Sequence, residues 1–97
     1  MLEKFKTYQL AKEFYMECKI LKMPSHLKDQ LLRAASSTAL NLAEGSAKPT
    51  IKDRIKFYAI AHGSHREVQA ILDLENVTHL EVKSKILGAC LHKLVHH

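Results

Sequence analysis

The chain has 97 residues, with 15 Lys and Arg against 10 Asp and Glu, which leaves a formal net charge of +5. A hydrophobic share of 46% with 26% charged residues is typical of one globular domain spanning residues 1–97, and it excludes a disordered chain. Three Gly and two Pro argue against a turn-rich β-sandwich, and the lack of Trp argues against an RNA reader that stacks bases.

Uncharged stretches and cysteines bear on the compartment. The longest stretch without a formal charge, Ala34–Ala43, is too short to cross a bilayer, so we expect no membrane association. Cys18 and Cys90 form no CxxC motif and no disulfide framework, which favours a reducing cytoplasm. Both lie on apolar helical arcs, where we expect buried, reduced thiols.

The first predicted helix runs from Glu3 or Thr7 to Leu21, with apolar residues at helical spacing. It ends before Pro24, because the residue that precedes a proline avoids the α conformation.

Ser25 is the expected N-cap of a second helix, at 26–44, and Gly45 its left-handed C-terminal cap. The expected core stripe of this helix follows the helical repeat: Leu27, Leu31, Ala34, Thr38 and Leu42.

Thr50 is the expected cap of a third helix, from Ile51 to Glu75, in which Gly63 suggests a close approach by another segment. The capping box Thr78-His79-Leu80-Glu81 predicts a fourth helix that ends near Val95. No strand alternation is visible, and short loops join neighbouring helices. The sequence therefore predicts an all-α fold, an antiparallel up-down-up-down four-helix bundle.

The third helix has two apolar or semi-polar faces at 100° per residue. The expected core face consists of Phe57, Ile60, Ala61, Ser64, Val68, Ile71 and Leu72. Beside it lies a face of Tyr, His and other semi-polar residues, which we call the seam: Ile55, Tyr58, His62, His65 and Gln69. The seam is either a rim of the core or an interface between subunits.

A third face of the same helix carries cations around the small residues Ala59 and Gly63. Between Ser46 and Arg66 the formal charge is +4, since five Lys and Arg stand against Asp53. Such a face is either simply solvated or a shallow groove for a phosphate backbone. The candidate nucleic-acid-binding residues, which we call the basic face, are Lys48, Lys52, Lys56 and Arg66.

The outward side of the second helix carries a further pattern, which we call the outer strip: Arg33, Ser37, Leu40 and Glu44. A leucine between charged residues is either a lone exposed hydrophobe or part of an interface. Together with the seam it predicts a cyclic homo-oligomer whose interface includes Arg33, Leu40, Glu44, Ile55, Tyr58, His62, His65 and Gln69.

Enzymatic motifs are absent: the sequence has no Walker loop, Rossmann glycines, GxSxG or HExxH. His62 and His65 lack further metal ligands, so we expect no metal, no cofactor and no catalytic residue. His62, His65 and Arg66 leave a small helical ribonuclease as an alternative, through acid–base chemistry on RNA.

Two segments together resemble one family. Leu32–Gly45 resembles the "RRAAxSIxxNIAEG" helix, and Phe57–Glu67 the "FLxIAxGSxxE" helix, of the bacterial 23S rRNA intervening-sequence proteins. The resemblance implies a four-helix bundle, often a homopentamer, related to accessory proteins of diversity-generating retroelements that bind nucleic acid and a reverse transcriptase. The family's marked positions fall here on Arg33, Asn41, Glu44, Gly45, Gly63, Ser64 and Glu67.

The expected function is therefore a non-enzymatic homo-oligomer that binds RNA or DNA through backbone electrostatics, with a reverse transcriptase as a further partner. The alternative of another class is a protein-binding scaffold without a nucleic-acid role.

Overall fold

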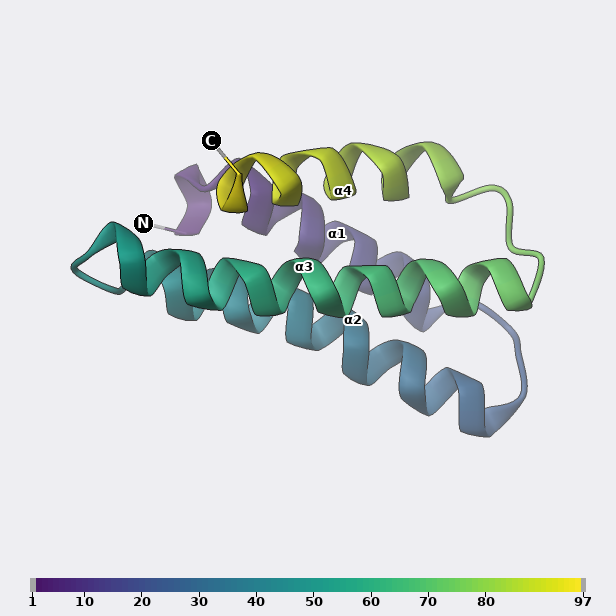
Figure 1. Ribbon diagram of the computed structural model, residues 1–97. Helices are drawn as coiled ribbons and strands as arrows, with labels where there is room; N and C mark the ends of the chain where they lie inside the picture. The colour runs from purple at the N-terminus through teal and green to yellow at the C-terminus, as the bar shows by residue number, and fades with distance from the viewer. Residues whose placement is uncertain (1, 97) are drawn as a thin grey trace.

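Four α-helices and one short 3-10 turn account for most of residues 2–96, the part of the chain that this computed structural model describes (Figure 1). The 3-10 turn η1 spans Leu2–Lys4, and the helices are α1 (Lys6–Lys19), α2 (Ser25–Ser46), α3 (Ile51–Leu74) and α4 (Glu81–Val95). Residues 2–96 contain no strand, which confirms the all-α prediction, and the predicted helix ends lie within two residues of the observed ones, apart from the start of α1. Residues 1 and 97 of the predicted domain lie outside the described part.

Each helix packs against two neighbours: α2 lies against α1 and α3, and α4 lies against the same two helices. The resulting body measures 40 × 21 × 21 Å (Figure 1). Its centre contains the most deeply buried side chains of all four helices: Cys18, Leu31, Thr38, Leu42, His65, Val68, Leu87 and Leu91. No helix within residues 2–96 is long and apolar enough to cross a membrane.

Two of the predicted N-terminal helix caps are not formed. The Oγ1 of Thr50 accepts a hydrogen bond from the backbone N–H of Asp53 at 3.1 Å, as expected for the start of α3. In contrast, Thr78 contributes only its carbonyl oxygen, to the N–H of Glu81, and the N-cap of α4 is Leu80. Ser25 is the first residue of α2 rather than its cap, because Pro24 occupies that position.

Neither Gly45 nor Gly63 has the role expected from the sequence. Gly45 lies inside α2 with a negative φ, so it is not a left-handed cap. A Cβ on Gly45 would lie 2.8 Å from Cε1 of Tyr58 and 3.0 Å from Cβ of Phe57, so α3 packs closely against α2 at Gly45. At Gly63 a Cβ would meet nothing within 4 Å. The expected close approach is therefore at Gly45 and not at Gly63.

The core face of α3 is rotated relative to the prediction. Its buried residues are Tyr58, Ala61, His65, Val68, Ile71 and Leu72. Ile60, expected in the core, is 52% exposed, and Phe57 and Ser64 are half-buried. The reason is that α3 is covered by α4 as well as by α2, and α4 contacts the side that carries His65.

The two cysteines differ in burial. Cys18 is completely buried, and burial together with the charge of Glu17 raises the pKa of its thiol to about 12. Cys90 is only half-buried, so the prediction of two buried thiols is wrong for Cys90. Both thiols are free.

Candidate nucleic-acid interface

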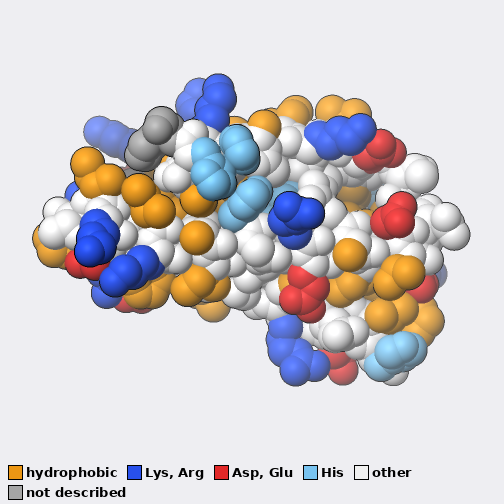
Figure 2. Space-filling model, viewed as in Figure 1, with side chains coloured by type: hydrophobic (Ala, Val, Ile, Leu, Met, Phe, Trp, Pro, Cys, Tyr) orange, Lys and Arg blue, Asp and Glu red, His pale blue; other side chains and the backbone are white. Residues whose placement is uncertain are grey.

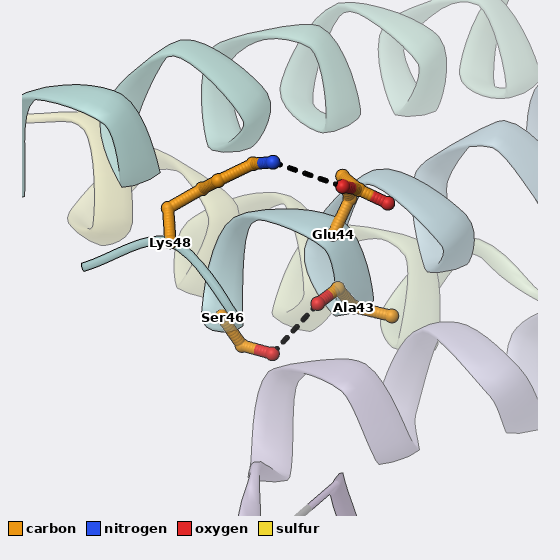
Figure 3. Close-up of polar contacts among 4 residues, drawn as sticks. All are labelled: Ala43, Glu44, Ser46 and Lys48. Carbon is orange, nitrogen blue, oxygen red and sulfur yellow. Dashed lines mark hydrogen bonds and ion pairs between the residues drawn. The ribbon is translucent and has the colours of Figure 1, made fainter. Parts of the chain in front are cut away.

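The basic face begins at the junction between α2 and α3. The Nζ of Lys48, in the loop between them, lies 3.1 Å from Oε2 of Glu44 (Figure 3). The same ammonium lies 5.0 Å from the ring centroid of Phe57. In the same turn the hydroxyl of Ser46 donates to the carbonyl oxygen of Ala43, which helps to close the end of α2. Lys48 is thus held in place, and its charge is partly compensated.

The first two turns of α3 carry three more cations, and two of them have partners. Lys56 lies 3.9 Å from Oδ1 of Asp53, and Arg54 donates its Nε–H to the carbonyl oxygen of Lys48 at 2.8 Å. Both side chains of the Lys56–Asp53 ion pair are exposed to water, so the pair is weak. The side chain of Lys52 makes neither an ion pair nor a hydrogen bond within residues 2–96.

Arg66 is the distal member of the basic face. Its side chain is exposed and makes no ion pair or hydrogen bond within the described chain. Because fourteen residues separate it from Lys52, the two lie about 21 Å apart along the same side of α3. Ala59 and Gly63 between them are exposed, and the space above Gly63 is open. The surface between Lys52 and Arg66 is therefore lined by small, exposed residues.

The seam is largely intramolecular, which corrects part of the predicted interface. Tyr58 and His65 are buried within the subunit, with 9% and 1% of their surface exposed, so neither can offer a side chain to a second copy. Ile55, His62 and Gln69 are half-buried along the edge where α3 meets α4. Of the two interpretations of the seam, the one that assigns it to the core of the subunit is correct for Tyr58 and His65.

His65 is buried because its polar atom has a partner. Its Nε2–H donates to the carbonyl oxygen of Ser84 in α4 at 2.9 Å, and its ring stands edge-on to Phe14 with centroids 5.6 Å apart. Gln69 donates to the hydroxyl of Ser84 at 3.1 Å, which completes the link between α3 and α4. Burial lowers the pKa of His65, although its hydrogen bond to Ser84 opposes this shift.

The outer strip of α2 lies beside α3. The hydroxyls of Ser37 and Ser64 are 2.9 Å apart, and Asn41 donates to both the carbonyl and the hydroxyl oxygen of Ser37. Leu40 is 67% exposed, and Ile60 of α3 is 52% exposed. The residues around the hydroxyl pair form a shallow pocket: Gln30, Arg33, Ala34, Ser37, Ser64 and Glu67. The sequence analysis did not predict Ile60 as an exposed residue, because its position in the helical repeat indicated the core.

Three imidazoles come together on the other side of α3, a grouping that the sequence analysis did not predict. The ring of His62 is 6.0 Å from that of His92, and the rings of His92 and His96 are 4.5 Å apart, all measured between centroids. Figure 2 shows imidazoles gathered where α4 passes over α3, with no Asp or Glu side chain directly against them in that view. The spacing of four residues between His92 and His96 was the available signal.

Metal ligation is a separate question, and within residues 2–96 no group of three or more His, Cys, Asp or Glu residues is placed to hold a metal ion.

Comparison with known proteins gives one result. The family model described as 23S rRNA-intervening sequence protein matches residues 3–87, which confirms the resemblance carried by α2 and α3. No curated protein and no solved structure matches the chain.

Proposed function

The chain belongs to the 23S rRNA-intervening sequence protein family, and we propose that it is a non-enzymatic, homo-oligomeric helical bundle that binds RNA or DNA through the phosphate backbone. The cytoplasm is the proposed compartment, because free thiols such as those of Cys18 and Cys90 persist in reducing conditions.

The observation that carries this proposal is the pair of uncompensated cations on one side of α3. Lys52 and Arg66 face the solvent with no partner within residues 2–96, while Lys48 and Lys56 lie nearby in weak, exposed pairs that a phosphate can replace. The start of α3 adds backbone N–H groups, which favour an anion. The family's description names ribosomal RNA, which supports a polyanion as the ligand class.

Oligomerisation is part of the proposal, because one subunit offers too few cations for tight binding. In a cyclic assembly the basic face repeats around the axis, so several weak contacts act on one polyanion. We take each subunit as an antiparallel up-down-up-down bundle. This is supported by the contacts between α2 and α3, since Ser37 meets Ser64 whereas the later Gly45 meets the earlier Tyr58. A pentamer and a reverse transcriptase partner follow from the family resemblance and remain part of the proposal.

A protein-binding scaffold is the second candidate, and the apolar surface of the outer strip favours it. Leu40 and Ile60 present two large exposed hydrophobic side chains beside the polar pair Ser37 and Ser64. This surface suits a helix of another protein as well as a second copy, and it needs no nucleic acid.

The deciding experiment is a binding titration of a labelled single-stranded RNA at about 50 mM salt. The double variant Lys52→Ala/Lys56→Ala should weaken binding and reduce the slope of log affinity against log salt by about 0.7 for each lost contact. The control Lys12→Ala/Lys22→Ala removes the same charge from exposed positions outside the basic face and should leave the slope closer to that of the parent protein.

Three outcomes distinguish the candidates. If Lys52→Ala/Lys56→Ala and Lys12→Ala/Lys22→Ala bind RNA equally well, the binding site lies outside the basic face. If the parent protein does not bind RNA, the protein-binding scaffold becomes the favoured function. Cleavage of the RNA that is lost in His62→Ala identifies the ribonuclease alternative.

A further inference from the structure

We propose that the imidazole cluster of His62, His92 and His96, together with Arg66, is a phosphate-binding site that takes up protons when the chain binds a nucleic-acid backbone. The inference rests on the proposed function and extends it to a second set of side chains on α3 and α4. Two of these side chains, His92 and His96, lie beyond residues 3–87 that the family model matches.

The cluster is assembled by helical spacing on both helices. His62 and Arg66 are four residues apart on α3, so they share one side of that helix. His96 is the C-cap residue of α4 and follows His92 by four residues. Contact between the two helices brings the rings of His62 and His92 to a centroid distance of 6.0 Å. His62 is half-buried, whereas His92, His96 and Arg66 are exposed, so a ligand in solvent can reach them.

The electrostatic surroundings of His62 are basic. Those that act on His62 are His92 and His96 from α4 and Arg66 from α3, and no acidic group from α1 or α2 is among them within the described residues. Burial, followed by these basic neighbours, lowers the pKa of His62. In the free protein protonation of His62 is therefore disfavoured, and the negative charge of a phosphate beside its ring would offset that effect.

Two of the rings lie at the C-terminal end of α4. His92 lies in the last turn of α4, and the backbone N–H of His96 caps that turn by donating to the carbonyl oxygen of His92 at 2.8 Å. Arg66 supplies a permanent charge beside them and also belongs to the basic face, so one phosphodiester chain can contact both sets of side chains.

The test compares RNA binding at two pH values. Anisotropy of a labelled oligouridine should show affinity that rises as the pH falls from about 7.5 to about 6.0, by up to about tenfold per pH unit for each proton taken up. Calorimetry in two buffers with different ionisation enthalpies should show the uptake of protons on binding. Circular dichroism at both pH values should verify that the helices remain folded.

Two double variants separate this site from the rest of the chain. His62→Gln/His92→Gln should lose most of the gain in affinity that the parent protein shows between pH about 7.5 and pH about 6.0. The control His26→Gln/His79→Gln removes two exposed histidines that belong to neither set and should keep the gain.

Failure of this inference is distinct from failure of the proposed function. A parent protein that binds at both pH values without proton uptake, or a cluster variant that keeps the full gain, overturns the inference alone. A parent protein that binds at neither pH overturns both. Binding that is found only at the lower pH and requires His62 and His92 supports the cluster and refutes the basic face as the main site.

Discussion

Gly45 of α2 lies against the ring of Tyr58 in α3, so closely that a Cβ on Gly45 would be 2.8 Å from Cε1 of the tyrosine. Because Tyr58 is itself buried, its ring has little room to move away. We expect Gly45→Ala to lower the free energy of unfolding by about 1–3 kcal/mol, despite the better helix propensity of alanine. Urea unfolding followed by circular dichroism measures this change.

Gly63→Ala is the matched substitution in the same pair of helices. Its Cβ would meet nothing within 4 Å, so only helix propensity changes, and we expect a gain of about 1 kcal/mol. Equal effects of the two substitutions, or a loss at Gly63 alone, would contradict the assignment of the close contact to Gly45.

Acid should weaken the subunit itself through His65. Burial holds the pKa of His65 below its ordinary value, so the unfolded chain binds a proton at a higher pH than the folded one. Stability is therefore complete above the ordinary pKa of about 6.5 and is lost progressively as the pH falls below it. The thermal midpoint should be lower at pH about 5.5 than at pH about 7.5.

The variant His65→Gln tests the origin of that acid sensitivity. Glutamine retains a donor toward the carbonyl oxygen of Ser84 but does not titrate in this range. We expect a lower midpoint at neutral pH and a smaller drop on acidification, with the remainder due to His62, whose pKa is also lowered. A drop as large as that of the parent protein would assign the effect to another group.

The two thiols should react at very different rates. Cys18 is completely buried and its pKa is raised to about 12, so it offers almost no thiolate to a reagent. Cys90 is half-buried and should be modified first by a bulky disulfide reagent under native conditions. Mass spectrometry of the partly modified protein identifies the site. Cys18→Ala should also cost more stability, about 1–2 kcal/mol, than Cys90→Ala.

The exposed hydrophobic residues beside the outer strip should hold the proposed oligomer together. Leu40→Glu/Ile60→Glu should reduce the mass measured by light scattering while leaving helix content unchanged, since both side chains are more than half exposed. Val82→Glu/Ile86→Glu is the control, because these residues of α4 are 71% and 50% exposed on another face. If only the control variant Val82→Glu/Ile86→Glu dissociates, the interface lies on α4. If the parent protein is a monomer, the proposed oligomer is excluded.

Local patterns in the sequence were enough for the helices and for most of their core. The apolar repeat of α2 correctly predicted Leu31, Ala34, Thr38 and Leu42 as buried, because helical spacing determines which side chains share a face. The cap at Thr50 was also predictable, since its hydrogen bond to the N–H of Asp53 joins residues three apart in the chain. The cations of the basic face and their formal charge depend on composition alone.

Tertiary packing decided the features that depend on which neighbour covers a helix. Periodicity alone could not show that α4 covers the side of α3 that carries His65, and the carbonyl oxygen of Ser84 that makes this burial possible lies nineteen residues away. The same applies to the pairing of His62 with His92, and to the ring of Tyr58 that requires a glycine at position 45. A helical repeat specifies directions around an axis, whereas the depth of burial in each direction is set by the helices that pack there.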